Sequence, residues 1–228
     1  MVLHPYFDKY SRLLLFDTET TGLSFTEDEI IEFAAVTLVR ESGEWVIEKK
    51  LDRLISLSPG TTLPLDIEQL TGITNAMLQV EGKPKTQVCQ EIAALLEGDT
   101  LLLAYNAHFD LSFLYHTLRR YGNPAVLKGK DKLDLLTVYR DRHLYPHRLC
   151  NAIDCYGLSG EVANTHRAID DVVATVAVMD AMRRERDDLH HYINLFGYNP
   201  KYGIGSKPIG SVTYKPQSYR PVAPLYEL

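Results

Sequence analysis

The chain has 228 residues, a formal net charge of −6 and 45% hydrophobic residues. The length suits one domain with a substantial core, and the acidic balance argues against sequence-independent binding along a nucleic-acid duplex. The sequence shows no signal-peptide core and no apolar run long enough to cross a bilayer, so we expect a cytoplasmic protein without membrane contact.

Three cysteines, an odd number, predict reduced thiols rather than a disulfide framework. A zinc site formed by Cys150 and Cys155 with His143 and His147 is the alternative. Their spacing lacks a Cys-x-x-Cys pair, so packing of these residues on a helix is the preferred interpretation.

Three strands and a short helix are predicted in the first third of the chain. Leu13 to Phe16 is an apolar run typical of a buried strand. Ile30 to Val39 and Trp45 to Leu57 predict two more strands, and Pro59-Gly60 ends this meander. Pro64 to Leu70 predicts a helix, with Gly72 just beyond it.

Helices alternate with another strand further along. A buried strand is expected over 100–105. Apolar residues with helical spacing and the turn residues between them predict five helices: 84–96, 109–121, 133–142, 148–156 and 168–191. Leading strands followed by alternating helix and strand predict an α/β fold.

The composition changes at residue 197. The remaining residues are rich in Gly and Pro and contain five tyrosines: Tyr198, Tyr202, Tyr214, Tyr219 and Tyr226. Their charges are Lys201, Lys207, Lys215 and Arg220 against Glu227. Four cations and one anion give +3, which leaves −9 for the rest of the chain. We therefore divide the chain into a domain over 1–196 and a basic tail over 197–228. Such a tail cannot build its own core, so it is expected to be extended or docked on the domain. The alternative is an arm that binds a partner or guides a strand, because its basic residues alternate with aromatic rings.

Two acidic residues, Asp17 and Glu19, follow the first predicted strand directly. Alternate residues of a strand share a face, so both carboxylates point the same way at its end. They would repel each other unless a positive charge lay between them, and a divalent cation meets that need.

Two further motifs carry polar residues of the same kind: Asn106-Ala107-His108-Phe109-Asp110 and His166-Arg167-Ala168-Ile169-Asp170-Asp171. Asp110 lies where a predicted strand gives way to a helix. Asp171 falls in the first turn of the long helix, where the dipole favours a carboxylate, and His166 lies on the preceding loop. Four carboxylates and one imidazole suit hydrolysis of a phosphodiester with two metal ions.

The order of these motifs resembles that of the DEDDh family of 3′–5′ exonucleases, the DnaQ-like nucleases. The family includes the proofreading exonuclease of bacterial DNA polymerase III and ribonuclease T. Its pattern is Asp-x-Glu, then Asp after Asn-x-x-Phe, then His-x-x-x-x-Asp. The segment from Leu65 to Thr74 is also similar to the linker between the first two motifs of proofreading domains. The resemblance implies a ribonuclease H-like mixed sheet flanked by helices.

On this hypothesis the four carboxylates hold two Mg²⁺ or Mn²⁺ ions, which prefer oxygen ligands. Asp17 bridges both ions, Glu19 and Asp171 help to hold the ion beside the attacking water, and Asp110 helps to hold the other. His166 is the general base, a role suited to an imidazole near neutral pH. The products are nucleoside 5′-monophosphates released from the 3′ end.

Four other residues are expected near the substrate. The resemblance places the backbone at Thr18 and Thr20 against the terminal nucleotide. Leu23 is a candidate wedge against the last base, and Asn106 either orients its motif or contacts the strand. Each has a plainer alternative: threonines at a strand end bond the local backbone, and Leu23 belongs to the core.

Three residues within or beside the motifs are not counted among the site residues. Tyr105 stands where many relatives have His, which puts a contact to substrate or to the metal ligands in question. His108 lies in the wrong motif to be the base and is assigned to the surface or to helix capping. Asp170 diverges from Asp171 by about 100° on a helix, so only one of them can face the metals, and the five-residue step from His166 in the family pattern selects Asp171. Position 167 is Arg, which excludes the tyrosine-type variant of the family.

The resulting hypothesis is a DNA 3′–5′ exonuclease, proofreading-like or free-standing, that acts on a single-stranded or frayed 3′ end. An RNA 3′-end trimmer is the alternative within the enzyme class, because relatives use similar residues for both sugars. A non-catalytic module that binds nucleic acid or a partner is the alternative outside it. A polymerase or another protein would then associate through the tail.

Overall fold

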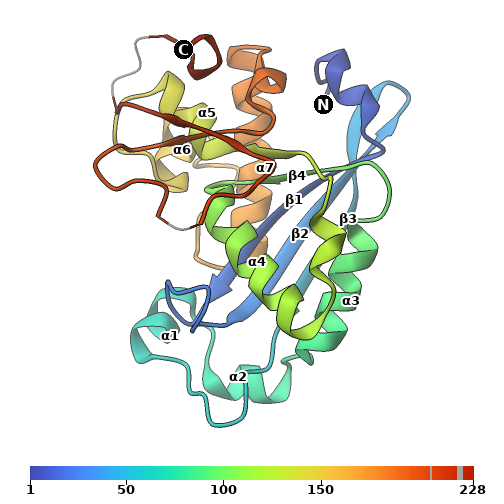
Figure 1. Ribbon diagram of the computed structural model, residues 1–228, viewed down its shortest axis with the longest axis vertical. Coiled ribbons are helices and arrows are strands. Elements are labelled where there is room, and N and C mark those ends of the chain that lie inside the picture. The colour runs from blue at the N-terminus through green and yellow to red at the C-terminus, as the bar shows by residue number, and fades with distance from the viewer. Residues whose placement is uncertain (206, 220–222) are drawn as a thin grey trace.

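The computed structural model describes residues 1–205, 207–219 and 223–228. Arg220, counted in the charge of the tail, lies outside the described residues. The centre of the fold is a five-stranded sheet in the order β3-β2-β1-β4-β5 (Figure 1). Its strands are β1 (Arg12–Thr20), β2 (Ile30–Glu41), β3 (Glu44–Leu54), β4 (Thr100–Ala104) and β5 (Lys132–Asp134). β1, β2 and β3 are antiparallel neighbours, whereas β4 and β5 run parallel to β1, so the sheet is mixed.

Helices cover both faces of this sheet: α3 (Lys85–Leu95) and α4 (Ala107–Tyr121) pack on one face, and α5 (Leu135–Arg142), α6 (Leu149–Cys155) and α7 (Ala168–Glu185) on the other. Two short helices, α1 (Leu65–Thr71) and α2 (Asn75–Val80), lie below the sheet in Figure 1. In Figure 1, α4 lies in front of the sheet and α7 behind it. Four shorter 3₁₀ turns lie at Pro5–Lys9, Pro124–Leu127, Leu189–Tyr192 and Leu225–Glu227. The arrangement is the ribonuclease H-like α/β fold that the motifs imply.

The first strand shows why the apolar run is continuous. Leu13 and Leu15 belong to the core cluster that includes α5, α6 and α7. Leu14 and Phe16 point to the opposite face and pack with α3 and α4. A central strand covered on both faces reads as an unbroken hydrophobic run rather than as an alternating pattern.

Two predicted helices differ from the observed ones, and one observed helix was not predicted. The helix expected over 133–142 begins at Leu135, because Lys132–Asp134 forms β5 and the Asp134 carboxylate caps α5 by accepting bonds from the N–H groups of Leu136 and Thr137. The helix expected over 168–191 ends at Glu185. There Arg142 donates hydrogen bonds to the carbonyls of Met182 and Arg186. The helix α2, capped by Thr74, was not predicted.

The described part of the C-terminal segment, residues 195–205, 207–219 and 223–228, is docked on the domain. β6 (Leu195–Tyr198) pairs in parallel with β7 (Thr213–Pro216), so the boundary expected at residue 197 falls inside a strand. In Figure 1 this orange-red segment crosses over α5 and α6. Leu225 is fully buried and its N–H donates to the carboxylate of Asp141. The described part of the segment is therefore docked on the domain, which is one of the arrangements expected for it.

Candidate active site

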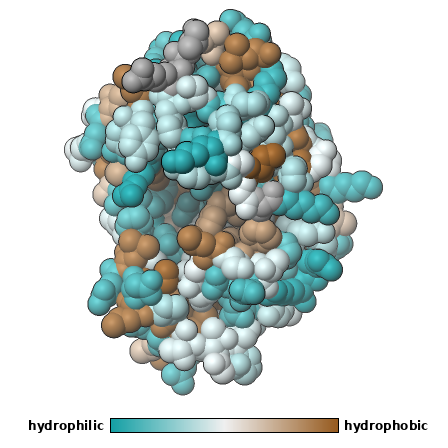
Figure 2. Space-filling model, turned by 60° about the vertical axis from the view of Figure 1, so that its left-hand side comes forward, coloured by the Kyte–Doolittle hydropathy of each residue, from teal (hydrophilic) through white to brown (hydrophobic). Residues whose placement is uncertain are grey.

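The face of the sheet covered by α7 ends in two carboxylates. Leu13, Leu15, Asp17 and Glu19 alternate along β1, and the first two belong to the core beneath α7. Asp17 and Glu19 continue that row at the carboxyl end of the strand. The space-filling view in Figure 2 shows a hollow at mid-height, between the part that carries α1 and α2 and the part that carries the C-terminal segment.

Asp110 reaches the same place from α4. It lies in the first turn of that helix and is 3% exposed. The Thr18 backbone N–H and the Thr18 hydroxyl both donate to its Oδ1, at 3.0 and 2.7 Å. The turn before the helix passes through Asn106, whose φ of 75° is in the left-handed region. These two hydrogen bonds hold the first turn of α4 against β1, so Asp110 lies beside the strand that carries Asp17 and Glu19.

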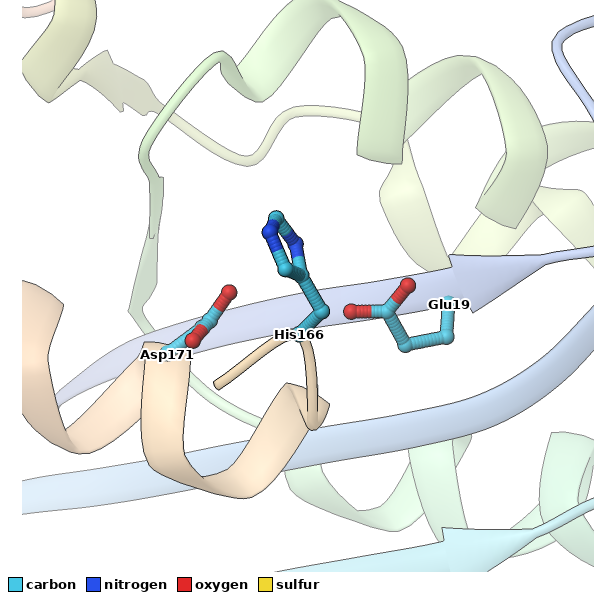
Figure 3. A group of neighbouring side chains, drawn as sticks. All are labelled: Glu19, His166 and Asp171. Carbon is cyan, nitrogen blue, oxygen red and sulfur yellow. The ribbon is translucent and has the colours of Figure 1, made fainter. Parts of the chain in front are cut away.

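Glu19, His166 and Asp171 converge. One ligand atom from each lies within 4.8 Å of the others, and in the described part of the chain this is the one such group of metal-binding side chains. Figure 3 shows the two carboxylates turned toward each other with the His166 ring between them. Asp170 instead accepts a bond from the Thr165 hydroxyl at 2.6 Å and is exposed. The structure thus places Asp171, and not its neighbour, in the cluster.

The loop before α7 positions these groups. His166 is exposed and has a φ of 57°, a conformation that few side chains adopt without support. Asp171 accepts hydrogen bonds from the Thr165 N–H, at 3.1 Å, and from the Asn164 side chain. These contacts turn the loop back on the helix that follows it.

Glu32, which the sequence motifs did not predict, holds the same loop from its position on β2. It stands opposite Glu19 on β2 and is fully buried. Its carboxylate accepts two bonds from the Arg167 guanidinium and one from the Ala168 N–H, the last at 2.7 Å. The available signal was its position, since Glu32 is the single charged residue between Ile30 and Val39. A buried charge of this kind needs a partner.

The carboxylates repel one another. Burial, reinforced by Asp110, Glu19 and Asp171, raises the pKa of Asp17 well above its ordinary value. Burial and the charge of Asp171 raise the pKa of Glu19 to about 8. Burial raises the pKa of Asp110 to about 7 against the opposing bonds from Thr18, and burial also raises the pKa of Asp171. Four clustered carboxylates that repel one another offer only oxygen ligands, and such a set fits Mg²⁺ or Mn²⁺.

Of the residues expected near the substrate, the two threonines bond to other groups of the protein, whereas Leu23 and Asn106 are exposed. The Thr20 hydroxyl donates to the Gly22 carbonyl at 2.6 Å, and the Thr18 hydroxyl is committed to Asp110, so both threonine side chains serve local structure. Leu23 is 84% exposed, which contradicts its alternative assignment to the core. Asn106 is exposed at the start of α4.

Tyr105 and His108 have structural partners. Tyr105 is buried, and its hydroxyl donates to the backbone carbonyls of His147 and Arg148. The His108 ring lies 2.7 Å from the Tyr214 hydroxyl, so it packs against the C-terminal segment. The residues of the alternative zinc site do not form a cluster of ligands. His143 Nδ1 lies 3.5 Å from Cys155 Sγ, but among the described residues no group of three or more ligand atoms forms there.

The fold and the acidic edge define the class first: a ribonuclease H-like domain with clustered carboxylates. Residues 14–179 match the family described as Exonuclease (RNase_T), so the chain belongs to this exonuclease family. It is 38% identical over 194 residues to a PolC-type DNA polymerase III of Halalkalibacterium halodurans, covering 79% of this chain and 12% of that protein. It is 39% identical over 112 residues to the 3′–5′ exonuclease DinG of Bacillus subtilis, covering 49% of this chain and 11% of that protein.

Solved structures agree on the fold. A structure of exonuclease I matches with a TM-score of 0.71 and 24% identity, over 80% of this chain and 43% of that one. Escherichia coli exonuclease I in complex with a dT13 oligonucleotide matches with a TM-score of 0.66 and 24% identity, over 77% and 41%. The chain therefore spans about an eighth of the curated relatives and less than half of the solved ones. Among its described residues, no helix is both long and apolar enough to span a membrane.

Proposed function

We propose that the chain is a metal-dependent 3′–5′ exonuclease that shortens single-stranded DNA and releases nucleoside 5′-monophosphates. The observation that carries this proposal is the convergence of Glu19, His166 and Asp171 beside Asp17 and Asp110. Family membership supports it. DNA is the preferred substrate because the curated relatives are DNA polymerases and a structural neighbour was solved with a DNA oligonucleotide.

Asp17, Glu19, Asp110 and Asp171 would hold two divalent cations, with Asp17 shared between them. Bound there, the cations would make the attacking water more acidic and stabilise charge on the entering and leaving oxygens. This role accounts for the raised pKa values of the carboxylates, since cations would restore the ionised forms.

His166 would take the proton from the attacking water. Its ring lies beside Glu19 and Asp171 and is exposed, so it can pass the proton on to solvent. Glu32 does not touch the cations: through Arg167 and the Ala168 N–H it holds in place the short segment between His166 and Asp171. Leu23 and Asn106 remain the candidates for contact with the terminal nucleotides.

A partner protein would deliver the strand to this acidic domain. The curated relatives contain a matching segment within a DNA polymerase, which is the reason to expect a polymerase as that partner. The C-terminal segment is the proposed contact.

End-labelled oligonucleotides test the proposal. The purified chain with Mg²⁺ should shorten 5′-labelled single-stranded DNA stepwise and release labelled mononucleotide at once from 3′-labelled DNA. Asp171→Asn should abolish this, whereas Asp170→Asn is the matched control, because its carboxylate lies outside the cluster. Release from the 5′ end, or full activity in Asp171→Asn, would refute the assignment. Faster hydrolysis of a matched RNA would move the substrate to the RNA alternative.

A further inference from the structure

A cavity lies at the start of α4, the helix that carries Asp110, and the C-terminal segment forms most of it. Its volume is about 190 Å³, and its lining includes Asn106, Arg140 and four tyrosines: Tyr198, Tyr202, Tyr214 and Tyr219. The tyrosines all lie beyond residue 179, where the match to the exonuclease family ends. The cavity therefore belongs to this chain's own extension.

The extension is fixed against the domain at this cavity. The Gly197 N–H donates to the Thr137 hydroxyl at 2.9 Å, and the Gln217 side-chain amide donates to the Thr137 carbonyl at 2.8 Å. The pairing of β6 with β7 and the contact of Tyr214 with His108 complete the attachment. The rings are thus held by backbone and side-chain bonds rather than left on a loose tail.

Arg140 supplies a positive charge to the cavity. Its Nε is buried and has no hydrogen-bond partner, and its guanidinium makes no ion pair within the described residues. The Asp134 carboxylate also lines the cavity, but it already accepts bonds from four backbone N–H groups and the Thr137 hydroxyl. A half-buried guanidinium without a partner is suited to an anion such as phosphate, which it binds through paired donors.

The position ties the cavity to the active site. Asn106 lines the cavity and precedes Asp110 by four residues, which is about 6 Å of rise along α4. A strand whose 3′ end lies at the carboxylates therefore has a neighbouring nucleotide within reach of the cavity. At about 190 Å³ the cavity is smaller than the roughly 300–1,000 Å³ of pockets for drug-sized ligands, so it suits one base.

We propose that this cavity is a nucleotide subsite in which a base stacks on the tyrosines while its phosphate pairs with Arg140. The inference rests on the proposed function, since it takes the nucleotide from a strand under hydrolysis or from the released monophosphate. Stacking on an aromatic side chain is worth about 1–3 kcal/mol per base, which corresponds to roughly 5- to 150-fold in affinity. The tyrosines would add contacts to a nucleotide next to the terminal one. These contacts would strengthen binding of the strand, which is otherwise weak for an acidic domain.

Binding of a 5′-fluorescein-labelled dT10 by anisotropy, with Ca²⁺ replacing Mg²⁺ and the DNA checked on a gel for cleavage, tests the subsite. Tyr202→Ala and Arg140→Gln should each weaken binding at least 5-fold. Tyr202 is 67% exposed, so its truncation leaves the fold intact. The matched controls are Tyr6→Ala and Arg184→Gln, an exposed tyrosine and an exposed arginine that do not line the cavity, which should bind as the wild type does.

Competition with free dTMP separates the two sources of the nucleotide. If dTMP displaces dT10 from the wild type more readily than from Arg140→Gln, the cavity holds the released product. If dTMP does not compete, the cavity holds a nucleotide of the strand. Unchanged dT10 affinity in both cavity variants would overturn the subsite. Failure of the proposed function would appear differently, as intact dT10 binding without hydrolysis in Mg²⁺.

Discussion

The acidic edge of the sheet and the C-terminal segment are built on opposite principles. At the edge, Asp17, Glu19, Asp110 and Asp171 are brought close together although their charges repel, and the pKa values of all four are raised. In the described part of the C-terminal segment, the Gln217 amide donates to the Thr137 carbonyl, the Leu225 N–H donates to Asp141, and the Leu225 side chain is buried. The first region gives up stability for chemistry, and the second adds stability beside it. Variants in the two regions should therefore separate activity from folding.

Removal of Asp17 should have the largest effect on activity. Asp17→Ala leaves two cations without their shared ligand, so we expect hydrolysis to fall by more than about 10⁴-fold, beyond the usual worth of a general base. It should also lose the stabilisation that Mg²⁺ gives the wild type, because binding to the folded state raises its melting temperature. Calorimetric titration with Mg²⁺ measures the affinity directly. A normal affinity in this variant would remove Asp17 from its bridging role.

His166→Ala should cost less and for a different reason. Loss of a general base lowers the rate by roughly 10²–10⁴-fold, while the four carboxylates that hold the cations remain. Single-turnover rates and Mg²⁺ titrations on the same preparation check both halves of the expectation. Loss of Mg²⁺ affinity together with the rate would make His166 a ligand instead of a base.

Leu225→Ala should act on folding alone. The side chain belongs to the last 3₁₀ turn and is fully buried, so its truncation should destabilise the chain by about 2–5 kcal/mol. Urea unfolding measures the change in free energy. Because Leu225 packs away from the carboxylates, the folded fraction of the variant should bind Mg²⁺ as the wild type does. A changed Mg²⁺ affinity would show that the two regions are coupled.

The stability of the metal-free chain should depend on pH. The folded state binds more protons than the unfolded state between the ordinary carboxyl pKa near 4 and the raised values, about 7 for Asp110 and about 8 for Glu19. Stability must therefore fall as the pH rises from about 4 to 8. At pH 8, Mg²⁺ at 100 times its Kd should restore about 2.7 kcal/mol, and at pH 5 much less. Thermal melts with EDTA and with Mg²⁺ measure both, and equal melting temperatures at pH 5 and 8 in EDTA would contradict the prediction.

The sequence predicted the edge better than the segment for physical reasons. The two-residue period of a strand and the 100° step of a helix are local, so the direction of Glu19 and the choice of Asp171 over Asp170 could be predicted from spacing. Glu32 stands out in the sequence as the single charged residue of a buried strand, but its partner Arg167 could not be predicted. The surroundings of Arg140 likewise depend on which segments lie beside it, and no local pattern carries that information. The same holds for Asp134, which ends β5 and caps the N-terminus of α5, so the helix begins two residues later than the apolar spacing predicts.

Anomalous diffraction from crystals soaked in Mn²⁺ tests the central claim most directly, because it shows where cations bind without reference to activity. The account predicts two anomalous peaks in contact with the Asp17 carboxylate, one beside Glu19 and Asp171 and the other toward Asp110. A single peak away from Asp17, or none at saturating Mn²⁺, would contradict it.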